Sequence, residues 1–244
     1  MQSKNSNIRF LIIMAMHDEA KPLINAMKLN EQGRINPNYT IEHYSGQTSG
    51  HTIDLIVNGR CSVYNVDQIG TQVSTLCAHL GIEKFNPNIV INAGTAGGFN
   101  SDNATIGDVY LSYPAINYHD RRINIPDFKE YGIGQYPAYN CSTITKALGL
   151  RTGIVTTGNS LDYTEQDMAM IKSYNGVVKD MEAAAIAWVA QQHSIPFLAI
   201  KSITDIVDGE HPTEREFLQN LHIASENLAR QAVKVIDWFT KEGI

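Results

Sequence analysis

Short apolar segments alternate with helical patterns along most of this chain. The apolar segments occupy residues 10–16, 88–93, 109–112, 153–157 and 196–203. The helical patterns occupy residues 18–27, 66–80, 164–173, 182–192 and 213–241. Continuous apolar runs bounded by turn residues are typical of strands that are buried on both faces. Their alternation with helices predicts an α/β fold in which a mostly parallel sheet is covered by helices on both sides.

Residues 39–58 depart from this pattern, because they read as a β-hairpin around Ser49-Gly50. We therefore expect the sheet to be mixed. No internal repeat or linker divides the 244 residues, so we predict a single domain over 1–244, with 1–8 as a loose N-terminal tail. Residues 118–140 are rich in Pro, Gly and Tyr and predict a long loop that is functional or contacts a partner.

Charge and cysteine content exclude several classes of function. A formal net charge of -6 provides no electrostatic surface for nucleic acid or for an anionic membrane. The longest apolar run, 10–16, is too short to span a bilayer, and a secretion signal there is a less favoured alternative to a buried strand. Cys61, Cys77 and Cys141 form no CxxC pair, which predicts free thiols in a reducing, cytoplasmic compartment.

The segment 178–208 places carboxylates after two apolar strands, with an Ala-rich helix between them. Ligands of open α/β sheets bind beyond the carboxyl ends of the strands, so Glu182 and Asp205 are expected to share one pocket. Burial and neighbouring carboxylates would raise the pKa of Asp205 and suit it to general acid catalysis. The alternative is that Asp205 or Asp208 caps a loop. Glu182 begins its helix, so a capping role and a ligand role are both open.

Two further segments carry candidate site residues. The strand before Gly94 runs into Gly94-Thr95-Ala96-Gly97-Gly98, which lets the backbone approach a ligand and offers the Thr95 hydroxyl. A strained turn without a ligand is the alternative, and the segment is neither a P-loop nor a GxGxxG motif. His17-Asp18-Glu19 lie at a helix start, where helix capping explains the acids as well as catalysis does.

Metal and hydrolase motifs are missing from the sequence. The eight histidines show no HxH or HExxH spacing, and His79 and His193 lie in helical patterns where a structural histidine is the simpler reading. We therefore predict no metal. The chain also lacks the GxSxG nucleophile elbow of serine hydrolases.

Five motifs, taken in order, resemble those of the 5'-methylthioadenosine nucleosidases of the purine nucleoside phosphorylase and uridine phosphorylase superfamily. They are MAMHDEA at 14–20, NAGTAGGF at 92–99, TTGNSLD at 156–162, KDMEAAAIA at 179–187 and SITDIVDG at 202–209. YHDRRINIP, TGNSLD and DGEHPTEREFLQNL are most similar to the plant-type branch. The resemblance implies a three-layer α/β/α sandwich with a twisted central mixed sheet, a homodimer, and hydrolysis of methylthioadenosine to adenine and 5-methylthioribose without a cofactor.

The resemblance also implies roles for individual residues. Asp205 matches the acid that protonates adenine N7, and Glu19 matches the residue that positions and deprotonates the attacking water. Asp205→Asn is therefore expected to lose most activity while the fold is retained.

The remaining predicted contacts concern the substrate itself. Glu182 would hold the ribose hydroxyls, with Met181 packed on the sugar. Leu161 would line the adenine side, Thr204 would orient the Asp205 carboxyl, and Phe217 would form a stacking wall, although these last three also read as core or capping residues. In the family the second subunit completes the alkylthio pocket, which gives the loop 118–131 a purpose, with His119 and Phe128 as candidates.

Two other functions stay open from the sequence. A phosphate-dependent nucleoside phosphorylase needs arginines around the phosphate, but Asn92 stands where phosphorylases of the superfamily carry arginine. Arg60 is the one arginine that would rescue phosphate binding, unless it is an exposed helix-start residue. A nonenzymatic nucleoside-binding or storage protein is the second alternative, and it would not require Glu19, Glu182 and Asp205 to be present together.

Overall fold

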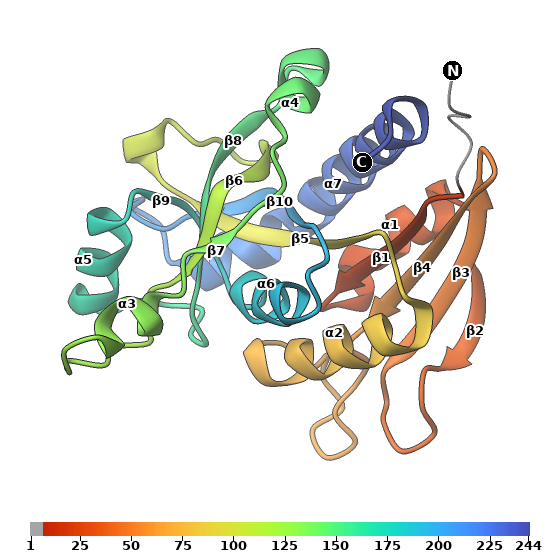
Figure 1. The fold of residues 1–244 in the computed structure, drawn as a ribbon. Helices are drawn as coiled ribbons and strands as arrows, with labels where there is room; N and C mark the ends of the chain where they lie inside the picture. Colours follow the sequence, from red (N-terminus) through yellow and green to blue (C-terminus); the bar gives the residue numbers. More distant parts are fainter. Residues whose placement is uncertain (1–6) are drawn as a thin grey trace.

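The computed structural model describes residues 7–244 (Figure 1). The strands are β1 (Arg9–Met14), β2 (Asn30–Arg34), β3 (Glu42–Thr48), β4 (His51–Val57), β5 (Ile89–Gly98), β6 (Val109–Tyr118), β7 (Tyr136–Pro137), β8 (Arg151–Thr157), β9 (Gly176–Asp180) and β10 (Phe197–Ile206). The helices are α1 (His17–Ala26), α2 (Thr71–Phe85), η1 (Asn100–Asp102), α3 (Phe128–Ile133), α4 (Ser142–Leu148), α5 (Glu165–Ser173), α6 (Ala183–Gln192) and α7 (Thr213–Glu242).

The strands form one mixed sheet in the order β10-β6-β8-β9-β5-β1-β4-β3-β2, with β7 paired to β6. Strand β10 pairs with β6 on one side and with β5 on the other, so β5, β9, β8, β6 and β10 close into a ring. The predicted hairpin is confirmed, since β3 and β4 pair antiparallel with Thr48 opposite His51. The mixed sheet predicted from sequence is therefore correct, and its closure at one end is an additional feature.

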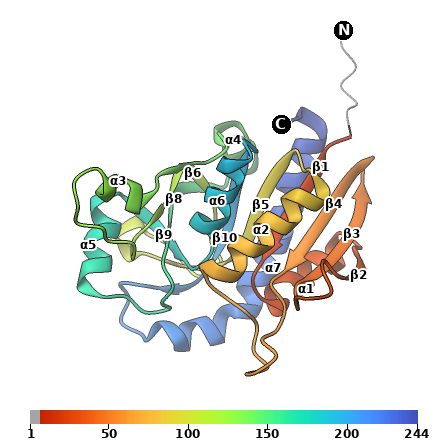
Figure 2. The same cartoon turned by 60° about the horizontal axis from the view of Figure 1, so that its bottom comes forward.

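Helices cover the two faces of the sheet, and the alternation of side chains along β1 shows why. Phe10, Ile12 and Met14 belong to a core with residues of α1 and α7. Leu11 and Ile13 belong to a second core with residues of α2 and α6. Successive strand residues point to opposite faces, so an unbroken apolar run requires two helix layers. Figures 1 and 2 show α2 and α6 together on one side of the sheet and α7 on the other. The three-layer sandwich is confirmed.

The sequence located the main elements but not all their bounds. The alternative reading of 94–98 as a strained turn is wrong, because β5 continues through this segment to Gly98, and Gly97 and Gly98 pair with β9. The helix predicted to start at 66 starts at Thr71, because residues 61–70 form a loop that ends at Gly70 with a φ of 93°. The segment 118–140 contains α3 and β7 in addition to loop.

The prediction of a loose N-terminal tail over residues 1–8 is wrong for its last residue. Ile8 is buried, and its backbone N–H donates a hydrogen bond to His51 Nδ1 at 2.9 Å. Residues 1–6 lie outside the part that the structure describes. Within residues 7–244, no helix combines the length and apolar character needed to cross a membrane.

Candidate active site

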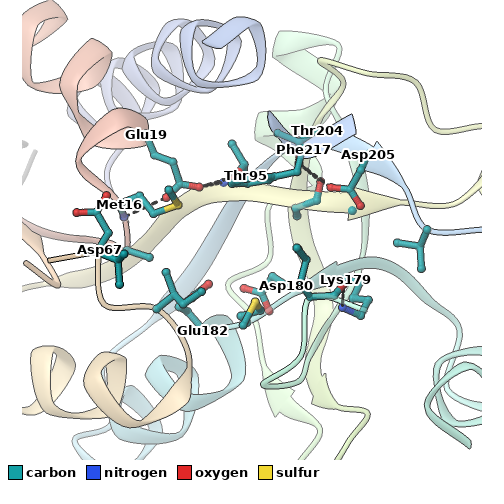
Figure 3. Close-up of a pocket in the computed structure, with 18 of the residues that line it drawn as sticks. Met16, Glu19, Asp67, Thr95, Lys179, Asp180, Glu182, Thr204, Asp205 and Phe217 are labelled. Carbon is teal, nitrogen blue, oxygen red and sulfur yellow. Dashed lines mark hydrogen bonds between the residues drawn. The ribbon is translucent and has the colours of Figure 1, made fainter. Parts of the chain in front are cut away.

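A cavity of about 510 Å³ lies at the carboxyl ends of β1, β5, β9 and β10 (Figure 3). It is lined by all eight residues that the sequence analysis selected: Glu19, Thr95, Leu161, Met181, Glu182, Thr204, Asp205 and Phe217. Parallel strands β1, β5 and β10 end on the same side of the sheet, so residues far apart in sequence meet there. The fold therefore brings the predicted residues together.

Glu19 projects from the first turn of α1 and is 4% exposed. The backbone N–H and the hydroxyl of Thr95 both donate to its Oε1, at 2.7 and 2.5 Å. The N–H of Met16 donates to Oε2 at 3.2 Å, so Glu19 does help to cap α1. Burial raises the pKa of Glu19, while Thr95 and Lys201 oppose the rise. Glu19 can therefore cap α1 and belong to the site at once, because its Oε2 meets the N-cap residue of α1 and its Oε1 meets Thr95 of β5.

Asp205 lies near the end of β10, and burial raises its pKa to about 6. The Thr204 hydroxyl, 2.8 Å from Asp205 Oδ1, and the charge of Lys179 oppose this rise, while Glu216 adds to it. The alternative capping role belongs to Asp208, whose Oδ1 accepts from the N–H of Asn100 at 2.6 Å. Asp205 itself does not cap this loop, and its side chain lines the cavity.

A β-bulge sets the direction in which Asp205 points. In the pairing of β10 with β5, Ile203 lies opposite Ala96 but Asp205 lies opposite Gly97, so Thr204 is an extra residue. A shift of one residue moves a side chain to the other face of a sheet. Gly97 supplies the space, because a Cβ there would lie 2.8 Å from Asp205 Oδ2. The glycine is required for close approach and not for a turn.

Glu182 occupies the N-cap position of α6, but its side chain does not cap that helix. The cap is formed by Asp180, whose Oδ2 accepts from the N–H of Ala183 at 2.9 Å. Glu182 Oε1 instead accepts from the N–H of Gly70 at 2.9 Å. Burial raises the pKa of Glu182 to about 7, with Lys201 opposing and Asp180 adding to the rise. The capping reading of Glu182 is wrong, and the carboxylate lines the cavity.

Lys201 is a component of the site that the sequence analysis did not select. Its Nζ lies 2.7 Å from Asp180 Oδ2, and the two side chains are 1% and 0% exposed. Burial alone would lower the pKa of Lys201, but Asp180, Glu182 and Glu19 together raise it. The available signal was a lysine inside an otherwise apolar strand, since such a residue is almost never buried without a partner.

Lys179 was also missed, and it fixes the segment that carries Leu161. Its Nζ donates to the carbonyl oxygens of Ser160 at 2.7 Å and Leu161 at 2.9 Å. Burial lowers the pKa of Lys179, while Asp205 and Asp180 oppose the fall. Leu161 itself is 40% exposed at the edge of the cavity.

Arg60 lines the cavity, but it is not a helix-start residue as the alternative reading assumed. It forms an isolated β-bridge with Asp67, and its Nε lies 3.6 Å from Asp67 Oδ1. Asn92 does not line the cavity, and its side-chain amide donates to the carbonyl oxygen of Ile13 at 3.0 Å. Among the described residues, the cavity wall carries two cations, Arg60 and Lys179, and Lys201 lies behind the wall against Asp180. The wall also carries five carboxylates, those of Glu19, Asp67, Asp180, Glu182 and Asp205.

The two residues proposed to contact a second subunit lie outside this cavity. His119 is 2% exposed, with its Nδ1 3.1 Å from the Thr156 hydroxyl. Burial lowers the pKa of His119 to about 4, so the ring is neutral near pH 7. Phe128 is 51% exposed at the start of α3. Their role toward a partner stays a prediction.

Comparisons with known proteins extend over nearly the whole chain. The family described as the Phosphorylase superfamily matches residues 9–237. A 5'-methylthioadenosine nucleosidase of Arabidopsis thaliana is 39% identical over 93% of this chain and 86% of its own length. A 5'-methylthioadenosine/S-adenosylhomocysteine nucleosidase of Arabidopsis thaliana is 37% identical over 94% of this chain and 91% of its own length. The apo structure of Arabidopsis thaliana 5'-methylthioadenosine nucleosidase has a TM-score of 0.93 and 38% identity and covers 96% of each chain.

We expect Lys201→Met to lower the free energy of unfolding by roughly 3–5 kcal/mol, because it leaves Asp180 buried without its partner. Urea denaturation measures this change. The double variant Lys201→Met/Asp180→Asn is expected to recover part of the loss. Arg60→Met, which removes an exposed guanidinium from its loose 3.6 Å contact with the part-buried Asp67, is the control and is expected to change stability by about 1 kcal/mol or less. A similarly small effect of Lys201→Met would contradict the proposed charge balance.

We expect the stability contributed by Asp205 to fall as pH rises. Its folded-state pKa of about 6 lies above the ordinary value of 3.8, so the folded state binds the proton more tightly. This contribution is complete below pH 4 and is lost as pH rises through 6. Asp205→Asn cannot ionise, so its stability relative to the unmodified protein is expected to rise by roughly 2–3 kcal/mol between pH 4 and pH 7.5. Denaturation curves with a pH-independent difference would rule this out.

Proposed function

This chain belongs to the 5'-methylthioadenosine nucleosidase family of the phosphorylase superfamily, and we infer from this membership that it hydrolyses the N-glycosidic bond of 5'-methylthioadenosine to adenine and 5-methylthioribose. The observation that carries the chemistry is the meeting of Glu19, Glu182 and Asp205 in one cavity. A storage protein has no need of this arrangement. The three carboxylates support an enzyme in preference to a nonenzymatic binding protein.

We propose that Asp205 is the general acid that protonates adenine N7. A catalytic acid works best when its pKa lies near the operating pH, and burial brings the pKa of Asp205 to about 6. Thr204 holds the carboxyl in place through a 2.8 Å hydrogen bond. Protonation makes adenine a better leaving group. Phe217, which lies beside Thr204 and Asp205 in Figure 3, and Leu161, which also lines the cavity, would bracket the base.

Glu19 is the proposed base for the attacking water. Two donors from Thr95 hold its Oε1, and the Met16 N–H donates to its Oε2, so the carboxylate is held in one orientation. A carboxylate oxygen can accept more than one hydrogen bond, so Oε2 can still accept one from the water. Bond cleavage leaves positive charge on the ribose, and Glu19 and Glu182 would stabilise that charge. Glu182 would also accept hydrogen bonds from the ribose hydroxyls, while Met181 packs on the sugar.

Water is favoured over phosphate as the nucleophile because of the charge of the cavity wall. The wall carries five carboxylates, and the nearby cations Arg60 and Lys201 already have carboxylate partners, Asp67 at 3.6 Å and Asp180 at 2.7 Å. A phosphate dianion needs cations that are not already neutralised by acids. The test is to incubate the protein with methylthioadenosine in phosphate-free and phosphate-containing buffer and to identify the sugar product by chromatography. Free methylthioribose in both buffers is expected. A sugar phosphate formed only with phosphate would make the protein a phosphorylase, and S-adenosylhomocysteine in the same assay measures acceptance of a longer tail.

Asp205→Asn and Glu19→Gln are expected to lower kcat by roughly 100- to 10,000-fold, because each removes a proton-transfer group. Asp208→Asn is the matched control, since Asp208 is exposed and only caps η1. The Asp208→Asn variant should retain most activity. Circular dichroism would show that each variant is folded, and full activity in folded Asp205→Asn would contradict the assigned role.

A homodimer and a cytoplasmic location are further parts of the proposal. Val63 and Tyr64 are 77% and 78% exposed in the loop beside the cavity, and Val66 and Ile69 both line the cavity and are 57% and 49% exposed. Exposed apolar residues that gather in this way are typical of an interaction surface. A second copy covering this loop would complete the pocket for the methylthio group. The three free cysteines are consistent with a reducing compartment.

Tyr64→Arg is expected to shift the protein from dimer to monomer and to raise KM, because it places a charge in the proposed interface. Size-exclusion chromatography with light scattering measures the mass. Ile223→Arg is the control, since Ile223 is 55% exposed on α7 and does not line the cavity. A monomeric unmodified protein with full activity would refute the dimer and leave the hydrolase assignment intact.

A further inference from the structure

Three potential metal ligands meet on the surface of the α2–α6 layer, away from the cavity. They are His79 and Glu83 of α2 and His193, the C-cap residue of α6. One ligand atom of each lies within 4.8 Å of the others. The spacing rules applied to the sequence could not find this set, because His193 comes from a different helix. His79 is exposed, so it is not a core residue of the α2–α6 layer.

The geometry of the cluster suits one ion. His79 and Glu83 are four residues apart and share a face of α2, as chelating pairs on helices do. His193 Nδ1 lies 3.7 Å from Glu83 Oε1, and the two imidazole rings have centroids 6.2 Å apart. Zinc binds its ligands at about 2.0–2.2 Å, so donor atoms must approach to roughly 3.5 Å. The exposed side chains of His79 and Glu83 have the rotamer freedom for this small adjustment.

The helix ends around the cluster favour a cation. Glu83 lies in the last turn of α2, and His193 follows the last residue of α6. Helix C-termini carry partial negative charge, and here two of them lie close to the ligand atoms. Lys84, the basic residue of the same turn, donates to the carbonyl oxygen of Ile35 at 3.0 Å and so is engaged elsewhere.

We propose that His79, Glu83 and His193 bind one divalent transition-metal ion of the zinc class, with water at the remaining position. Two imidazoles and one carboxylate suit Zn²⁺, whereas Mg²⁺ prefers an all-oxygen site. None of the three residues lines the cavity, so the ion would be structural. It would link α2 to α6, and the other ends of these helices meet where the Gly70 N–H donates to Glu182.

Isothermal titration calorimetry of the full chain, freed of metal with a chelator, tests the site with ZnCl₂ and with MgCl₂. We expect one Zn²⁺ per chain, no heat with Mg²⁺, and a higher Tm in the presence of Zn²⁺. His79→Ala and His193→Ala should each weaken Zn²⁺ binding at least ten-fold, and Glu83→Gln should weaken it less. His222→Ala is the control, because His222 is an exposed histidine of α7 outside the cluster.

Zn²⁺ binding that is unchanged in folded His79→Ala and His193→Ala would overturn the proposal, as would equal loss in His222→Ala. Absence of measurable Zn²⁺ binding to the unmodified protein would also overturn it. Each outcome is independent of the nucleosidase activity, since the readouts are calorimetric heat and Tm.

Discussion

The buried ion pair between Lys201 and Asp180 is the interaction on which the cavity depends. Glu19, Asp180, Glu182 and Asp205 are buried around one cavity. Repulsion between these carboxylates would favour either their protonation or the opening of the site. One ammonium group placed behind them reduces this repulsion. Asp180 holds that ammonium and also caps α6, so the same side chain fixes the charge balance and the start of the helix that follows Glu182.

The closed part of the sheet explains why these charges can be packed so tightly. Strand β10 pairs with β5 from Phe197 to Ile206, and its residues 200–202 also pair with β6 on the other side. A strand paired on both sides has its backbone polar groups satisfied, so a lysine within it has to find only a partner for its side chain. The carboxyl ends of β5, β9 and β10 line the cavity on the side of the sheet, and the loop 61–70 contributes Asn65, Val66, Asp67 and Ile69.

Much of the fold and site followed from sequence because local pattern and chemistry agreed. Apolar runs predicted the central strands, and acids at the ends of two of them predicted a shared pocket. The sequence did not reveal the closure of the sheet, which depends on pairing between β10 and β6, or the partner of Lys201. It also left a capping role open for Glu182, since nothing in the local pattern shows that Asp180, two residues earlier, accepts the bond from Ala183. Such contacts join residues that are far apart in the sequence or depend on how the chain turns in space, so a short stretch of sequence does not reveal them.

The bulge at Thr204 divides β10 into two parts with different alternation. Before Thr204, Leu198 and Ile200 face one helix layer and Ala199 and Ile203 face the other. After it, Asp205 lies opposite Gly97 and lines the cavity. The apolar residues before Thr204 can therefore be exchanged for others of similar size without changing the face on which Asp205 lies. Lys201 is the exception in this stretch, because its ammonium group pairs with Asp180.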